Sequence, residues 1–148
     1  MEKANLFRLT FIGLVVIHFF NIAEQSFGKF TVWVHKLITK FHNKFDFPDF
    51  AINDATIMML LLVVLIILIV VGTLVFLEIK WSWKLALIIA FFDFLYGIAH
   101  FTAGIYFRTY FPGMVSATLM IMLSVLVLYF YYLMMNPLKK ENVTGNKV

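Results

Sequence analysis

Four ionisable side chains lie well inside long apolar stretches of the sequence, and they are the candidates for chemistry. His18 and Glu24 lie in the first such stretch, and Asp93 and His100 lie in the third. Ionisable groups are costly in hydrocarbon, so they usually mark a functional site there. Two histidines and a carboxylate can bind zinc and leave one position for a water molecule, which the metal activates as hydroxide. His18, Glu24 and His100 therefore predict a divalent metal centre, with zinc as the first candidate, that supports hydrolysis.

Helical spacing sorts the polar residues of the two stretches into two stripes, because residues three, four or seven apart share one face of a helix. The stripes are His18, Asn21 and Gln25, flanked by Glu24, on the first stretch, and Asp93, Tyr96, His100 and Phe107 on the third. Counted from the start of each apolar run, His18 lies about 18 Å and His100 about 22 Å along its helix, with Asp93 about 10 Å deeper. We therefore expect His18, Asn21 and Glu24 to meet His100, with Asn21 and Gln25 supporting the ligands by hydrogen bonds.

The same residues allow two interpretations without a metal. In the first, His18 and His100 hydrogen-bond to each other, to Asn21 or to the backbone, and only stabilise helix packing. In the second, Asp93, Glu24 and the histidines form a proton relay or a metal-free catalytic site.

The elements that must position these residues are membrane helices. Of the 148 residues, 63% are hydrophobic and 14% are charged, and the mean hydropathy is +0.94. Runs of about 20 apolar residues can cross the hydrocarbon core of a bilayer as helices. We predict an all-α polytopic membrane protein, a four-helix bundle in a single domain over 1–148. Its spans are expected at about 6–25, 55–77, 85–107 and 114–135, before a polar tail at 136–148; a signal peptide is a weaker interpretation of the first span.

The segment between the first two spans predicts an amphipathic helix over about 29–45. Its apolar residues recur at helical spacing, and Lys36, Lys40 and Lys44 follow one another along another face. Such a helix lies in the membrane interface with its lysines among the lipid headgroups. It is either a structural strut or a lid over a site, with His35 or His42 reaching inward.

The charge distribution indicates membrane orientation and partners. With four spans, seven Lys and Arg residues fall on the side of the two termini and five on the other side. The excess favours a plasma-membrane protein with both termini in the cytoplasm. No basic tract with interleaved aromatic residues indicates nucleic-acid binding, so membrane lipids are the expected partners. The chain has no cysteine, which excludes disulfides and thiolate metal sites.

The segment "AHFTAGIYFRTYFPGMVSATL" resembles the signature of the HXXEE-domain membrane proteins. In that signature a histidine on the third span precedes an Arg-x-Tyr-x-Pro-Gly turn and a small hydroxyl residue. The matching residues are His100, Arg108, Tyr110, Pro112, Gly113 and Ser116. The resemblance extends over about 6–138 and implies four spans, a motif at the end of the first, and a metal-dependent hydrolase acting on a lipid or another apolar substrate.

The motif that names the family is altered in this chain, where the corresponding segment is "HFFNIAEQ". With Asn21 at the position of the motif histidine, Glu24 is retained and Gln25 replaces the second glutamate. With His18 at that position, Asn21 and Ile22 replace both glutamates. His18 can also substitute for the motif histidine from one turn earlier on the same helix face.

The predicted roles follow from these positions. Glu24, Asp93 and His100 are the candidate catalytic residues, and Arg108, with Tyr110 and Tyr96, is the candidate for binding a phosphate or carboxylate of the substrate. The altered motif keeps another class of protein open. That class is a non-catalytic accessory or binding subunit of a membrane complex, or an immunity-type protein that binds a partner membrane protein.

Overall fold

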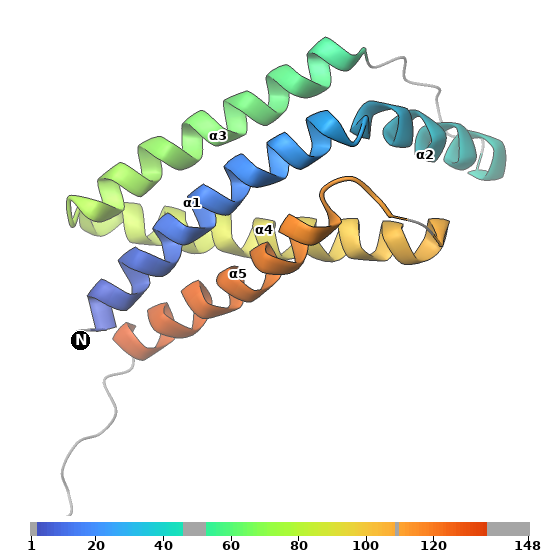
Figure 1. The fold of residues 1–148 in the computed structure, drawn as a ribbon. Helices are drawn as coiled ribbons and strands as arrows, with labels where there is room; N and C mark the ends of the chain where they lie inside the picture. Colours follow the sequence, from blue (N-terminus) through green and yellow to red (C-terminus); the bar gives the residue numbers. More distant parts are fainter. Residues whose placement is uncertain (1–2, 46–52, 109, 136–148) are drawn as a thin grey trace, which may run out of the picture.

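Five helices make up the part of the chain that the computed structural model describes, namely residues 3–45, 53–108 and 110–135 (Figure 1). They are α1 (Lys3–Phe27), α2 (Phe30–Phe45), α3 (Asp54–Phe76), α4 (Lys80–Phe107) and α5 (Met114–Met135). All except α2 are long and apolar enough to cross a membrane. The predicted all-α class with four spans is therefore confirmed; the predicted polar tail lies outside the described residues.

The four long helices form one bundle with α1 at its centre. Helix α1 lies between α3 and α5, and α4 crosses behind them and packs mainly on α5 (Figure 1). The beginning of α1 and the end of α5 lie at the same end of the bundle, where Lys3 Nζ donates a hydrogen bond to the Leu133 carbonyl at 3.2 Å. Helix α2 leaves the other end of α1 at an angle, so the short amphipathic segment is separate from the spans (Figure 1).

Small residues on α4 allow α5 to approach closely. A β-carbon added to Gly97 would lie 2.6 Å from Ile121 Cγ1 and 3.0 Å from the Ala117 carbonyl oxygen. Ala86 and Ala90 lie on the same face of α4 and are fully buried. Small residues are typical of helix contacts in membranes, where backbone proximity takes the place of hydrophobic driving force. This tight crossing sets where each residue of α4 meets its neighbours.

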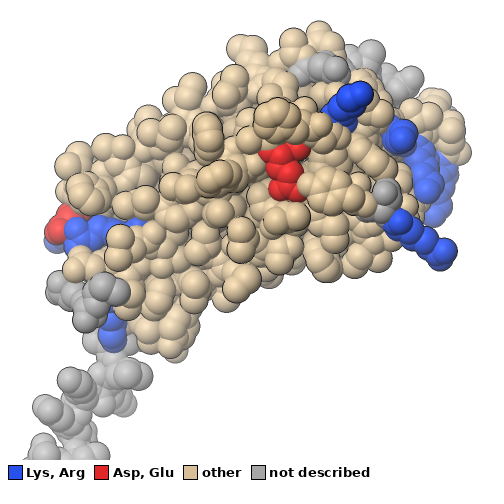
Figure 2. Space-filling model, viewed as in Figure 1, with Lys and Arg blue, Asp and Glu red and all other residues tan. Residues whose placement is uncertain are grey.

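The outer surface of the bundle is apolar over most of its length. Lysine and arginine side chains gather at the two ends, and a nearly uncharged band separates them (Figure 2). Many large hydrophobic side chains in this band are exposed, including Ile66 at 60% and Phe92 at 62%. A surface of this kind suits hydrocarbon rather than water. The protein is therefore a multi-pass membrane protein.

Two of the helices begin earlier than the predicted spans, and this difference affects the site. Helix α1 begins at Lys3 instead of residue 6, and α4 begins at Lys80 instead of residue 85. A span predicted from a run of apolar residues ends at the first lysine. The helix itself continues through the lysine, because the long side chain can carry its charge to the membrane surface. Trp83 lies in the first turns of α4, with the centre of its ring 5.8 Å from that of Phe7.

Candidate functional site

The two predicted stripes meet inside the bundle and form a polar cluster together with the loop between α4 and α5. The members of the cluster are His18, Asn21, Glu24 and Gln25 from α1, Asp93, Tyr96 and His100 from α4, and Tyr110, Gly113 and Ser116 from the loop and α5. Most of them are buried, and Asn21 and Gln25 are each 1% exposed. The cluster thus has nearly all of its polar groups inside a membrane-spanning bundle.

His18 pairs with Asp93, not with His100. His18 Nε2 lies 2.8 Å from Asp93 Oδ1, and both side chains are less than 10% exposed. The expected match with His100 is wrong because both helices start earlier than the apolar runs suggest. Counted from the actual helix starts, His18 and Asp93 lie about 22 Å and about 20 Å along their helices, whereas His100 lies about 30 Å along α4.

Asn21 and Gln25 connect all three elements of the cluster. Gln25 Nε2 donates to Asn21 Oδ1 at 2.7 Å and also to the Tyr96 hydroxyl. Asn21 Nδ2 in turn donates to Ser116 Oγ at 2.8 Å and to the Gly113 carbonyl at 3.3 Å. The two amides thus bond to each other, to α5 and to Tyr96. Their predicted role in supporting metal ligands stays a prediction.

Glu24 stabilises the beginning of α5 from a neighbouring helix. Its carboxylate accepts hydrogen bonds from the backbone N–H of Val115 at 3.3 Å and of Ser116 at 3.0 Å, and from Ser116 Oγ at 2.7 Å. The Tyr110 hydroxyl donates to the same carboxylate. A negative charge is favourable at a helix N-terminus, where backbone N–H groups lack partners. The first turn of α5 contains no acidic residue of its own, and this signal could have indicated a cap from elsewhere in the fold.

His100 lies in an aromatic enclosure. Its ring stacks on Phe30 of α2 at 5.4 Å and lies 4.3 Å from Tyr96 and 5.2 Å from Phe111. Helix α2 therefore covers His100 through a phenylalanine, a residue that sequence reasoning missed. His35, which the lid hypothesis placed near the site, is exposed, and His42 is half-buried.

Gly113 allows three nitrogen atoms to converge beside the turn. A β-carbon added to this residue would lie 3.0 Å from Asn21 Nδ2, 3.0 Å from His100 Nδ1 and 3.1 Å from Gln25 Nε2. The glycine also has a φ of 89°, which side-chain-bearing residues rarely adopt. The turn therefore brings His100 close to the two amides, although His100 Nδ1 makes no hydrogen bond to either of them.

The predicted metal ligands have separate environments. His18 is bonded to Asp93, Glu24 to α5, and His100 is enclosed by aromatic rings. Over residues 3–45, 53–108 and 110–135, no three side chains of His, Cys, Asp or Glu form a group that could hold a metal ion. The residues in this arrangement do not fit a three-ligand centre, and metal binding stays a prediction.

The predicted substrate-binding residues lie at different depths. Arg108 ends α4 with a left-handed backbone, φ 50°, and has an exposed side chain. Tyr110 is 51% exposed and bonded to Glu24, whereas the hydroxyl of Tyr96 lies inside the cluster. Arg108 and Tyr110 are thus open to the surroundings, and Tyr96 is not.

We expect Tyr110 to titrate well above an ordinary tyrosine. Burial raises the pKa of Tyr110 to about 12, and the hydrogen bond and negative charge of Glu24 add to the rise. Because the folded-state pKa is raised, the contribution of this hydrogen bond to stability is complete below about pH 10 and is lost as the pH rises through about 12. Glu24→Gln should lower the Tyr110 pKa toward about 10. Tyrosinate absorbance measured against pH, with Tyr110→Phe identifying the signal, tests this; an unshifted titration in the wild type would contradict it.

The fold defines a polytopic helical membrane protein with a polar cluster buried in its bundle. The chain belongs to the HXXEE family: the family described as "Protein of unknown function with HXXEE motif" matches residues 9–128, from α1 to within α5. No curated protein and no solved structure matches the chain. The family membership expected from the segment around His100 is confirmed.

The structure also distinguishes the two motif alignments. When Asn21 takes the position of the motif histidine, the three motif positions are Asn21, Glu24 and Gln25, and all three hydrogen-bond within the cluster. In the other alignment one motif position falls on Ile22, an apolar residue on the flank of the stripe. The geometry therefore favours the alignment that begins at Asn21.

Proposed function

We propose that this protein is an intramembrane enzyme that hydrolyses an ester or amide dissolved in the membrane, and that its polar cluster binds the carbonyl group of that substrate. One observation carries the proposal. Asp93 Oδ2, His100 Nδ1 and Gln25 Oε1 are buried and have no hydrogen-bond partner among the described residues. An unpaired buried polar atom lowers stability by about 1–3 kcal/mol, so three such atoms in one cluster suggest that a ligand or water molecule binds there. Gln25 Oε1 and the Asp93 carboxylate oxygen accept hydrogen bonds, so the missing partners are donors, such as the O–H groups of the attacking water or an N–H group of a bound amide.

The substrate class follows from charge and geometry. Glu24 and Asp93 would repel an anionic reacting group, so a neutral ester or amide carbonyl suits the cluster better than a phosphate. Both N–H groups of Asn21 are engaged within the cluster, but its 3.3 Å bond to the Gly113 carbonyl is the longer of the two. Asn21 would have to exchange that bond to donate to a carbonyl oxygen as it gains negative charge. Because the cluster lies inside the membrane-spanning bundle, its substrate would be a lipid or another apolar molecule. Arg108, exposed at the end of α4, is the candidate for an anionic headgroup of that molecule.

His100 is the proposed general base. Its unpartnered Nδ1 faces the two amide groups across Gly113. Water would add to the carbonyl carbon while its proton passes to His100 and then to the leaving oxygen or nitrogen, as the acyl bond breaks. Asp93 orients the imidazole of His18 at the other end of the cluster, so His18 is a positioning residue or a second acid–base group.

The predicted zinc remains a separate hypothesis. To bind a metal, His18 would have to leave Asp93 and Glu24 would have to leave the N-terminus of α5. Elemental analysis of the purified protein distinguishes the metal-dependent from the metal-free hydrolase. One metal per chain that His100→Ala removes would support the metal-dependent hydrolase. The proposed roles of His100 and the two amides do not require a metal.

We also propose that the protein lies in the plasma membrane with both termini in the cytoplasm. The larger number of Lys and Arg residues on the side of the termini supports this orientation. The ends of α1 and α5 lie together, as an even number of spans requires.

The experiment compares hydrolysis of acyl esters and amides dispersed in detergent micelles. We expect His100→Phe, which keeps a ring against Phe30, to lower the rate about 100-fold or more, because a general base contributes roughly that much. His35→Ala is the control, since His35 is exposed on α2 and should leave the rate unchanged. Equal rates for wild type and His100→Phe, or no product from any ester or amide, would instead support a non-catalytic accessory subunit or a proton relay.

A further inference from the structure

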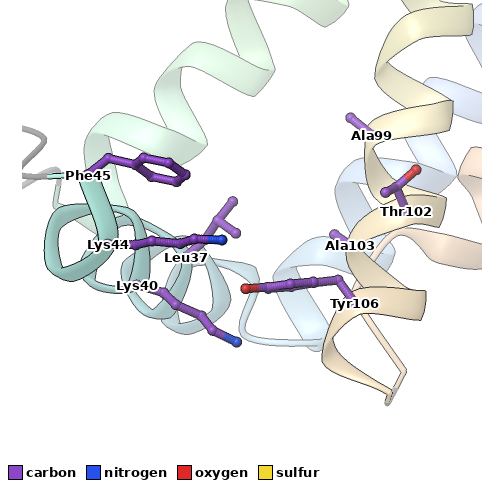
Figure 3. A pocket seen from close by; sticks show the side chains of 8 residues that line it. All are labelled: Leu37, Lys40, Lys44, Phe45, Ala99, Thr102, Ala103 and Tyr106. Carbon is purple, nitrogen blue, oxygen red and sulfur yellow. The ribbon is translucent and has the colours of Figure 1, made fainter.

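A groove of about 480 Å³ lies between α2 and α4, on residues that the polar cluster does not use. Its α4 side is formed by Ala99, Ala103 and Tyr106, and its α2 side includes Leu37, Lys40 and Lys44 (Figure 3). Ala99 and Ala103 are one turn apart on the same face, so their small side chains leave space where larger ones would fill it. The volume falls in the range of ligand pockets in proteins.

The two lysines place positive charge at the edge of this apolar groove. Both extend from α2 toward α4, and Lys40 Nζ lies 4.2 Å from the centre of the Tyr106 ring (Figure 3). Such a contact holds an ammonium group over the ring face without neutralising its charge. None of the described residues that line the groove is acidic. The groove therefore combines an apolar floor with two cationic groups.

The position of α2 indicates the depth of the groove in the membrane. Helix α2 is amphipathic and lies at the end of the bundle beyond the membrane-spanning part of α1 (Figure 1). Amphipathic helices of this kind lie at the boundary between headgroups and acyl chains. The groove thus opens where a lipid has its phosphate on one side and its chains on the other.

We propose that this groove binds an anionic phospholipid. An acyl chain lies against Leu37, Ala99 and Ala103, and the phosphate lies between Lys40 and Lys44. The net negative charge of the lipid complements the two lysines, whereas a zwitterionic lipid carries a cation of its own that they repel. The site shares no residue with the polar cluster, so it stands or fails independently of the proposed hydrolase.

The test measures lipid retention by native mass spectrometry after purification and exchange into micelles that contain phosphatidylglycerol or phosphatidylcholine. We expect the protein to retain phosphatidylglycerol in preference to phosphatidylcholine. The double variant Lys40→Ala/Lys44→Ala should lower this retention by about 10- to 30-fold, since each lysine near a membrane surface strengthens the binding of an anionic lipid by about 5-fold. Lys36→Ala is the matched control, because Lys36 lies on α2 above Trp33 and outside the groove.

A second pair of variants tests the apolar floor. Ala99→Phe fills the groove and should abolish retention, whereas Ala55→Phe adds the same ring to an exposed position of α3 and should not. Unchanged helix content in each variant confirms that the bundle is intact. Equal losses for Lys36→Ala and the double variant would overturn the proposal in favour of diffuse surface attraction. Unchanged retention in Ala99→Phe, or displacement of the lipid by inorganic phosphate alone, would also overturn it.

Discussion

Replacing His18 by alanine should lower the free energy of unfolding by about 3–5 kcal/mol, because it leaves the buried Asp93 carboxylate without its partner. The two side chains are joined at 2.8 Å and are 8% and 9% exposed. Asp93→Ala should also lower the free energy of unfolding, because it leaves the buried imidazole of His18 without its partner. Thermal unfolding in detergent, followed by circular dichroism, measures both losses.

A second ion pair in the protein serves as the control. Arg8 and Glu78 are 2.6 Å apart, but the Glu78 side chain is 63% exposed. Glu78→Ala should therefore change stability by no more than about 1 kcal/mol. A loss for His18→Ala as small as that of Glu78→Ala would show that the pair does not stabilise the bundle.

The double variant His18→Leu/Asp93→Leu separates stability from function. Apolar residues of similar volume often replace a buried pair without loss, so much of the stability should return. Hydrolysis should remain low if the pair serves catalysis. Full hydrolytic activity in this variant would mean that the pair is only structural.

Replacing Gly113 by alanine should destabilise the protein by about 2–3 kcal/mol and disrupt the polar cluster, because a left-handed residue with a side chain is strained. The new β-carbon would also press on Asn21, Gln25 and His100, whose nitrogen atoms would lie 3.0–3.1 Å away. The measurement is thermal unfolding, together with the hydrolysis assay.

Gly104→Ala is the matched control for this substitution. Its β-carbon would meet the Met114 sulfur at 2.7 Å, but that atom belongs to a flexible side chain that can move aside. Gly104 also lies within α4, where alanine favours the helix by about 1 kcal/mol. The control should therefore be nearly neutral. Equal losses of stability for Gly113→Ala and Gly104→Ala would mean that the close approach of Asn21, Gln25 and His100 to Gly113 does not stabilise the protein.

The membership of the polar cluster could largely be predicted from residue type and helical spacing. His18, Asn21 and Gln25 are buried on one face of α1, and Asp93 and His100 are buried on one face of α4, as expected. Polar residues avoid lipid, so a polar stripe on a membrane helix must face the interior of the bundle. Neither the partner of each residue nor the covering ring of Phe30 followed from this argument.

The sequence by itself determined that this chain has four apolar helices and a separate amphipathic one, because hydrocarbon admits only helices whose backbone groups bond internally. It also determined which faces of α1 and α4 point inward. Only the tertiary structure decided that His18 meets Asp93, that Glu24 caps α5, and that the turn at Gly113 brings Asn21, Gln25 and His100 together. These pairings depend on helix starts, crossing angles and the reversal between α4 and α5, which arise from packing between distant segments and not from local periodicity.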